Sequence, residues 1–367
     1  MSTQFPFVSF VLPLRNEAAS MRDCLDSILA QDYPSDRFEV IVVDGESDDH
    51  TPAIAREYAG HDSRVRLVVN PGRIVPTGMN VGIRSARGEI VARVDGHTRI
   101  APDYVRMGVD TLQRTRADNV GGAMNAVGGG TFGDAVAHAT SSRFGVGSYF
   151  HFGTEERSVD TVYMGMWPRS VFERAGLFDE ELVRNQDDEL NYRIRKTGGT
   201  IVLNPRMRSW YQNRQGVRRL ARQYFQYGEW KVRVLQKHPR QMSWRHFVPP
   251  FFVATLLLLG ILGVVVPQTS FLLAAVVGAY SGTILAIAAA NALSRGVGTW
   301  LATAAAFMII HLAWGIGFLA GLARFAHWWR RSEPAPLYLE PRGESSSRNV
   351  SAKDTGLAVS EAVGRTV

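Results

Sequence analysis

The stretch Val91-Ala92-Arg93-Val94-Asp95-Gly96-His97 decides the fold of this chain. Its first half is apolar and rich in β-branched residues, which is typical of a strand buried inside a sheet. Gly96 permits a sharp turn directly after that strand. Asp95 and His97 could together hold one divalent cation, and ligands of open α/β sheets bind at this end of the strands. On these residues alone, a plain strand-ending turn with a solvated aspartate is the alternative.

Short apolar runs and helical patterns alternate through the first half of the chain. This alternation predicts βαβ units and an α/β domain with a mostly parallel sheet. Asn16 is expected to cap the first helix. The expected strands are 7–12, 39–43, 65–69, 89–94 and 120–127, and the expected helices are 17–30, 51–58, 77–86, 102–116 and 185–196. Residues 163–167 lead to Pro168, which can start a helix.

The N-terminal region and the cysteine content bear on the location of the first half of the chain. The first seven residues have no basic region followed by a long apolar core, so no signal peptide is expected and this half should remain in the cytoplasm. Cys24 is the single cysteine of the chain. It excludes an internal disulfide and is interpreted as a buried structural thiol.

Three long apolar runs follow, at 247–266, 271–293 and 297–323, and each is long enough to cross a bilayer. Three crossings from a cytoplasmic start would place Arg324, Arg330 and Arg331 outside, against the positive-inside tendency. Two or four crossings satisfy that tendency. The sequence predicts a multi-pass protein of the cell membrane and leaves the number of crossings open.

A basic segment precedes these runs. Residues 206–246 hold eleven Lys and Arg residues and the single acid Glu229. Aromatic residues among them at 215–236 predict an amphipathic helix in contact with anionic membrane lipid, with an ordinary surface helix as the alternative. No nucleic-acid motif accompanies the charge, so no nucleic-acid partner is expected. The predicted domains are 1–205 (α/β), 206–246 (interface segment), 247–331 (transmembrane) and 332–367, a polar tail expected to be disordered.

Four polar clusters lie where predicted strands end or helices begin. Together they are hard to explain as unrelated turns and caps, because the carboxyl ends of parallel strands meet at one edge of a sheet. The clusters are Leu12–Glu17, Val43–Thr51, Asp95–His97 and Asn185–Leu190.

Five motifs in this order resemble the inverting family 2 glycosyltransferases of the GT-A fold. They are P-x-R-N-E at 13–17, V-D-G-x-S-x-D-x-T at 43–51, a D-x-D-like triplet at 95–97, G-L-F-D-E at 176–180 and D-x-E-L-x-x-R at 187–193. The resemblance covers about residues 7–240. Within the family it is nearest to the ExoA-like enzymes of succinoglycan and other exopolysaccharide assembly. It implies a Rossmann-like GT-A domain followed by C-terminal transmembrane helices.

The resemblance also implies roles for single residues. Asp44 is expected to contact the nucleotide base, with Pro13, Arg15 and Glu17 along the nucleotide cleft. Asp95 and His97 are expected at the diphosphate and its metal, Mn²⁺ or Mg²⁺, and Asp187 as the catalytic base.

The chain departs from the family pattern at three places. His97 replaces the last aspartate of the triplet, and Gln186 replaces the glutamate before the base, where Asp188 remains an alternative base. Arg218 is expected to bind a diphosphate or a lipid phosphate. Arg219 replaces the tryptophan of the Q-x-x-R-W motif, so processivity is not inferred.

The predicted activity is that of a membrane-bound hexosyltransferase. It moves a sugar from a nucleotide-sugar, UDP-glucose or similar, to a lipid-linked saccharide acceptor. A divalent ion suits the charge that develops on the leaving diphosphate, and one base suits a single inverting displacement. The alternatives are transfer to a free polyprenyl phosphate and a non-catalytic membrane scaffold.

Overall fold

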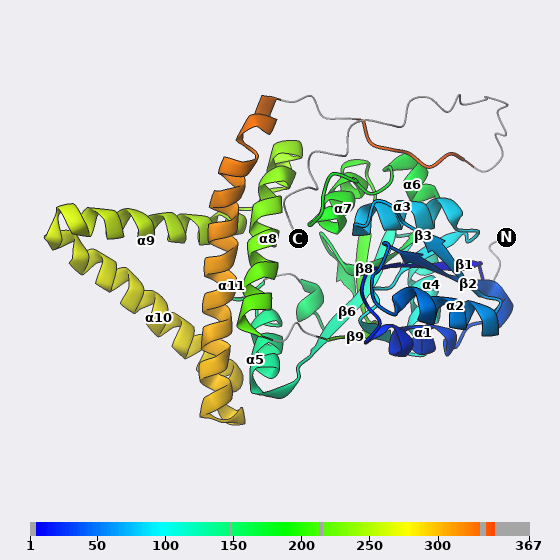
Figure 1. Ribbon diagram of the computed structural model, residues 1–367, viewed down its shortest axis with the longest axis horizontal. Helices are drawn as coiled ribbons and strands as arrows, with labels where there is room; N and C mark the ends of the chain where they lie inside the picture. Colours follow the sequence, from blue (N-terminus) through cyan, green and yellow to red (C-terminus); the bar gives the residue numbers. More distant parts are fainter. Residues whose placement is uncertain (1–4, 147–148, 213–215, 331–334, 342–367) are drawn as a thin grey trace.

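The chain combines an α/β domain with long apolar helices (Figure 1). The computed structural model describes residues 5–146, 149–212, 216–330 and 335–341. The sheet of the α/β domain has nine described strands, and helices cover its faces. The combination of GT-A domain and apolar C-terminal helices predicted from the sequence is confirmed.

Parallel strands form the first half of the sheet, in the order β3-β2-β1-β4. Every residue of β2 is buried, which fits a strand covered by helices on both faces. The carboxyl ends of β1, β2 and β4 therefore lie side by side. The elements are β1 Val8–Leu14, α1 Met21–Leu29, β2 Phe38–Asp44, α2 Thr51–His61, β3 Val65–Val69, α3 Val75–Ser85 and β4 Ile90–Arg93.

The second half of the sheet is mixed. β8 pairs antiparallel with β4 and with β6, and β6 runs parallel to β9. The predicted parallel arrangement thus describes the first four strands, and β9 extends across the division expected after residue 205. The elements are β5 Thr98–Ile100, α4 Tyr104–Thr115, β6 Asn119–Val127, α5 Gly130–Thr140, β7 Arg157–Ser158, β8 Tyr163–Pro168, α6 Ser170–Arg174, α7 Gln186–Lys196 and β9 Ile201–Gln212.

The first helix begins later than predicted, and Asn16 does not cap it. Asn16 adopts a left-handed conformation with φ 58°. Its backbone N–H donates to Ser47 Oγ over 2.9 Å, and its side-chain oxygen accepts from the N–H of Asp48 over 3.0 Å. Asn16 therefore joins two loops at the end of the sheet, and α1 begins at Met21.

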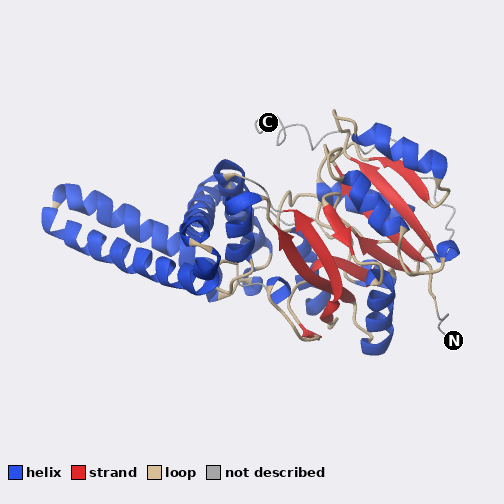
Figure 2. Cartoon of the chain, turned by 90° about the horizontal axis from the view of Figure 1, so that it is seen from below, coloured by secondary structure: helices blue, strands red, loops and turns tan. Residues whose placement is uncertain are grey.

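Four long helices follow the sheet: α8 Val217–Lys237, α9 Val248–Val265, α10 Ser270–Ala292 and α11 Val297–Arg324. Three stretches, Trp244–Val265, Pro267–Arg295 and Val297–Arg324, are long and apolar enough to cross a membrane. α9 and α10 form a hairpin that projects from the rest of the molecule, whereas α11 lies beside α8 (Figures 1 and 2).

The apolar face of α8 packs against protein. Leu220 and Tyr224 of α8 are buried in one cluster with Phe307 and Ile310 of α11. The sequence predicts that this face meets lipid, but α11 covers it. The reason is that both helices carry apolar faces of similar length, which bury each other between the α/β domain and the hairpin.

A short segment after the apolar helices returns to the α/β domain. Leu177 donates its N–H to the Leu337 carbonyl over 2.6 Å, and Leu339 donates to the Phe172 carbonyl over 3.2 Å. Leu339 is buried in the core around α6. Residues 335–341 are therefore ordered, contrary to the predicted disorder of 332–367. The remainder of that tail lies outside the described residues.

Candidate active site

Hydrogen bonds from backbone N–H groups to side-chain oxygens join the loops that follow β1 and β2. Glu17 donates its N–H to Thr51 Oγ1 over 2.8 Å, and Ala18 donates to Asp49 Oδ2 over 3.1 Å. Asp44 at the end of β2 is buried and accepts from the N–H of Ser47 over 3.2 Å. The polar motifs at 13–17 and 43–51 thus form one rigid corner at the end of the sheet.

The end of β4 adds a guanidinium, a carboxylate and an imidazole to this corner. Arg93 is buried, and its Nε donates to Asp95 Oδ1 over 2.7 Å. His97 Nδ1 lies 3.1 Å from Glu17 Oε1. The His97 ring meets Tyr211 of β9 edge to face, with centroids 5.0 Å apart. These contacts fix both side chains that the sequence assigns to a metal.

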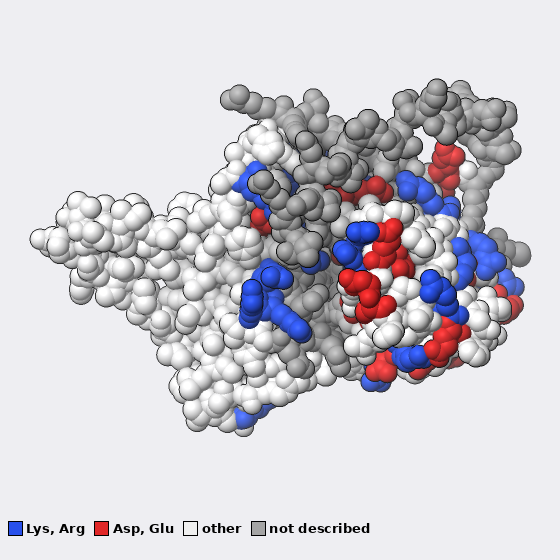
Figure 3. All heavy atoms as spheres, viewed as in Figure 1, with Lys and Arg blue, Asp and Glu red and all other residues white. Residues whose placement is uncertain are grey.

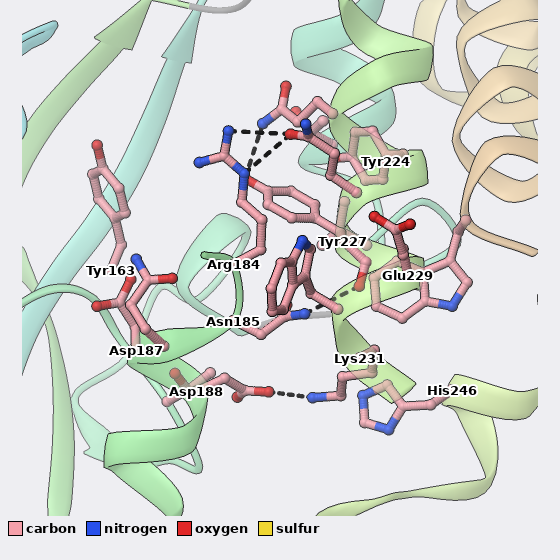
Figure 4. Close-up of a pocket in the computed structure, with 18 of the residues that line it drawn as sticks. Tyr163, Arg184, Asn185, Asp187, Asp188, Tyr224, Tyr227, Glu229, Lys231 and His246 are labelled. Atoms are coloured by element: carbon pink, nitrogen blue, oxygen red, sulfur yellow. Dashed lines mark hydrogen bonds and ion pairs between the residues drawn. The ribbon is translucent and has the colours of Figure 1, made fainter. Parts of the chain in front are cut away.

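Asp187 lies at the start of α7 and faces the end of β4. Arg93 Nη1 donates to Asp187 Oδ1, so Asp95 and Asp187 share one guanidinium. The two carboxylates, which the sequence assigns to the diphosphate and to the base, thus lie on either side of Arg93. Figure 4 shows Asp187 beside Tyr163, with Asp188 turned the other way towards Lys231.

The surroundings of the two carboxylates shift their pKa values in opposite directions. Burial raises the pKa of Asp187, Asp95 adds to that rise, and Arg93 partly opposes it. Burial acts on Asp95 in the same sense, but Arg93 and His97 hold its pKa below the ordinary range. Two carboxylates with separated pKa values are typical of sites in which one acid binds charge and the other exchanges a proton.

Asp95 and His97 fit a divalent cation in part. A carboxylate on one ring nitrogen of a histidine is the usual support for a metal ligand, because it orients the ring and leaves the other nitrogen for the metal. Glu17 stands in this position to His97. Among the described residues, no group of three or more His, Cys, Asp or Glu side chains is arranged to hold a metal. A cation here would take its further ligands from a bound diphosphate or water.

A cavity of about 3330 Å³ extends from this corner to the apolar helices. Its wall includes six of the residues assigned from the sequence, namely Pro13, Arg15, Glu17, Asp95, His97 and Asp187. Asp44 and Arg218 do not line it. Arg219 and Arg222 of α8 do, and the wall continues to residues of α9, α10 and α11, which are Phe252, Tyr280, Ile310, His311 and Trp314.

Buried ion pairs attach α8 to the segment that carries Asp187. Lys231 pairs with Asp188, and Arg233 pairs with Glu181 over 2.8 Å. The Lys231 and Arg233 side chains are 2% and 1% exposed. Only part of the basic segment predicted to face lipid is available to it, because Lys231 and Arg233 are buried against acidic side chains of the protein. Arg218, Arg219 and Arg222 in the first turns of α8 remain exposed.

The sequence analysis assigned no role to Arg93, and it placed Lys231 only within the basic segment expected to contact lipid. An arginine inside an apolar strand was a usable signal for Arg93, because buried charges are rare unless they are paired. Lys231 had no such signal, since it lies among other basic residues with aromatic neighbours. Tyr163 was likewise missed. It binds Thr98 Oγ1 over 2.8 Å beside Asp95.

Comparisons with known proteins identify the family of this chain. The model of glycosyl transferase family 2 matches residues 9–176. The succinoglycan biosynthesis protein ExoA of Rhizobium meliloti (strain 1021) is 30% identical over 328 residues, which are 86% of this chain and 94% of that protein. A Methanococcus voltae protein is 26% identical over 65% of this chain and 77% of its own length. Its name is dolichyl N-acetyl-alpha-D-glucosaminyl phosphate 3-beta-D-2,3-diacetamido-2,3-dideoxy-beta-D-glucuronosyltransferase.

A solved structure shows the same fold. The mannosyltransferase PcManGT of Pyrobaculum calidifontis, in complex with GDP-Man and Mn²⁺, superposes with a TM-score of 0.55 at 22% identity. The match covers 84% of this chain and 87% of that one. With the family model matched and a relative 30% identical over 94% of its own length, the chain belongs to glycosyl transferase family 2 and is a glycosyltransferase.

Proposed function

We propose that this glycosyltransferase is membrane-bound and transfers one sugar, with inversion, from a nucleotide-sugar to a lipid-linked saccharide. The observation that carries this proposal is the single cavity that joins Asp95, His97 and Asp187 to the apolar residues of α9, α10 and α11. A water-soluble donor can reach Asp187 from one end of this cavity, and a lipid-borne acceptor can reach it from the other.

The donor occupies the end of the cavity formed by the strand ends. Arg15 offers a guanidinium on the cavity wall, and Asp44 supports the neighbouring loop at Ser47. Asp95 and His97 would hold a divalent cation, Mn²⁺ or Mg²⁺, and the cation would supply positive charge to the leaving diphosphate. We assign UDP-glucose or a similar UDP-sugar as donor from the family motif at 43–51, in which Asp44 supports the loop at Ser47.

The acceptor hydroxyl attacks the anomeric carbon of the donor sugar from the side of Asp187. The new C–O bond forms as the bond from that carbon to the nucleoside diphosphate breaks. The hydroxyl proton passes to Asp187, whose Oδ1 is held by Arg93 while Oδ2 accepts. Attack opposite to the leaving group inverts the anomeric configuration. A positioned base of this kind contributes about 10²–10⁴-fold to the rate.

The acceptor occupies the end of the cavity between α8 and the apolar helices. Tyr227 and Trp230 of α8 offer aromatic faces to the saccharide, and Phe252 and Trp314 offer apolar surface to its carrier chain. Arg219 and Arg222 lie on the same wall, where guanidinium groups suit carrier phosphates. The name of the Methanococcus voltae relative, which specifies a dolichyl-linked acceptor, supports this choice.

A second candidate activity is transfer to the phosphate of a free polyprenyl carrier. Arg219 and Arg222 support it, because they could hold a terminal phosphate in the cavity as easily as an internal one. Such an acceptor is already ionised and needs no base. Asp187→Asn therefore abolishes transfer to a hydroxyl but leaves much of the transfer to a phosphate.

Incorporation of labelled sugar into membrane lipid tests the proposal. Membranes that contain the protein are supplied with a panel of UDP- and GDP-sugars, with and without Mn²⁺. We expect metal-dependent incorporation from one UDP-sugar, and its loss in Asp187→Asn. Asp36→Asn serves as the matched control, since that side chain is 78% exposed on the α/β domain. Absence of nucleotide-sugar turnover under saturating metal rejects the proposal.

A further inference from the structure

The three apolar stretches of this chain differ in what covers them. Only 11% of the apolar window of the α9 and α10 stretches is buried, against 44% of the α11 window. The exposed apolar residues of the hairpin include Val264, at 85%, and Phe271, at 76%, near its tip. Figure 3 shows the hairpin as a projection without Lys, Arg, Asp or Glu on that face. Length and composition alone do not separate the three stretches, but packing does.

α11 is bound to α8 along its length. A Cβ atom at Gly317 would lie 2.1 Å from the Phe225 carbonyl oxygen, so the backbones of the two helices approach as closely as only glycine allows. Arg324 at the end of α11 pairs with Glu229 over 2.9 Å. Since α8 is itself attached to the α/β domain through Lys231 and Arg233, α11 belongs to the same rigid unit.

Both ends of the hairpin lie at this unit. At the start of α9, the Pro249 carbonyl oxygen lies against Gly315 of α11. At the end of α10, Arg295 Nη1 lies 2.8 Å from His138 Nε2 of α5. The hairpin therefore leaves and re-enters the molecule on one side, and its uncharged tip at 266–270 points away from it (Figures 1 and 2).

The chain after α11 is also on the side of the α/β domain. The segment 335–341 binds Phe172 and Leu177 of that domain through backbone hydrogen bonds. A short 3₁₀ helix, Ala326–Arg330, follows α11. Five peptide steps separate residue 330 from residue 335, and they span at most about 18 Å. The hydrocarbon core of a bilayer is about 30 Å thick. The end of α11 and the α/β domain thus share one side of the membrane.

We infer that the chain crosses the membrane twice, as the α9–α10 hairpin, and that α11 stays on the side of the catalytic domain with its outer face on the membrane surface. The 22-residue stretch Trp244–Val265, which contains α9, and the 23-residue α10 are about 33 and 35 Å long, enough for the bilayer core. The outer face of α11 carries exposed Leu301, Met308 and Ile316. This arrangement keeps Arg295 and Arg324 on the same side of the membrane as the catalytic domain and the basic helix α8, as the positive-inside tendency requires.

Single cysteines labelled from one side of the membrane test the inference. The buried Cys24 is replaced by Ala, and one cysteine is introduced at a time by Gln268→Cys in the tip, Ser294→Cys before α11, Tyr338→Cys after it, or Asp36→Cys on the catalytic domain. All four positions are exposed, so these substitutions should not disturb packing. A membrane-impermeant maleimide is applied to sealed vesicles or cells, before and after permeabilisation.

We expect the cysteine at 268 to react from the side opposite to the one at 36. We expect those at 294 and 338 to react from the same side as the one at 36. Opposite sidedness of 294 and 338 means that α11 crosses and overturns the inference. A tip that reacts only from the side of residue 36 means a hairpin that does not cross, and it overturns the inference as well. Neither readout requires sugar transfer, so the result is independent of the proposed donor and acceptor.

Discussion

Arg93 binds Asp187 although 94 positions separate them in the sequence, and the same guanidinium donates to Asp95 over 2.7 Å. One buried cation thereby connects the carboxylate assigned to the donor diphosphate with the carboxylate assigned to the acceptor hydroxyl. The position of Arg93 sets the spacing of the two carboxylates and the electrostatic potential at each of them.

Replacement of Arg93 should impair the chemical step more than the fold. For Arg93→Gln we expect kcat to fall by about 10²-fold, as for the loss of one preorganised charge in an active site. Arg93→Lys should keep part of the activity, because it retains the charge but not the fork that holds two carboxylates. The measurement is steady-state transfer alongside thermal unfolding. Equal kcat in Arg93→Gln and the unmodified protein would show that the guanidinium is only structural.

The acid side of the pH profile should report Asp187. Burial raises the pKa of this carboxyl, and the base must be deprotonated to accept the hydroxyl proton. As the pH falls, kcat should therefore decline at a higher pH than an ordinary aspartate, of pKa about 3.9, would give. In Arg93→Gln the opposing charge is lost, so the decline should move to still higher pH. A decline at the same pH in both proteins contradicts this assignment.

Asp188 should matter for stability rather than for proton transfer. Asp188→Asn leaves Lys231, whose side chain is 2% exposed, without its buried anion. We expect a loss of about 3 kcal/mol of unfolding free energy. Lys231→Met should cost less, because the Asp188 side chain is 35% exposed and water can solvate it.

The double variant Asp188→Asn, Lys231→Met should recover much of the loss, since it leaves no buried charge unpaired. Denaturant unfolding in detergent of the unmodified protein, the two single variants and the double variant gives the coupling free energy between the two side chains. If the losses of unfolding free energy in the single variants simply add in the double variant, the pairing is contradicted. Loss of kcat in Asp188→Asn at unchanged stability would instead make Asp188 the base.

His97 should set the metal requirement of the reaction. For His97→Ala we expect the Mn²⁺ concentration that gives half-maximal activity to rise by at least 10-fold. Glu17→Gln should shift it in the same direction by about 10- to 100-fold, as for other residues that orient a metal-binding histidine. A titration of activity against Mn²⁺ measures both. Unchanged metal dependence in His97→Ala would assign the imidazole another role, such as packing against Tyr211.

Much of the catalytic half was predictable because local signals there are strong. A run such as F-E-V-I-V-V-D is typical of a buried strand. Asp44 and Asp95 lie at the carboxyl ends of such runs, which is where ligands bind to a parallel sheet. The start of α1 was not predictable, because the Asn16 side chain accepts a hydrogen bond from Asp48 of the neighbouring loop and does not cap the helix. The pairing of Arg93 with Asp187 depends on how closely α7 approaches β4, which neither segment encodes alone.

The sequence by itself determined the family, the α/β domain, the carboxylates at its strand ends and the presence of three apolar stretches. The tertiary structure decided how those parts are used. It directed Lys231 and Arg233 to buried acids instead of lipid, and it covered α11 with α8 while leaving α9 and α10 bare. The physical reason is that hydropathy measures the cost of contact with water. Protein and lipid relieve that cost equally, so only the packed structure shows which of the two an apolar helix meets.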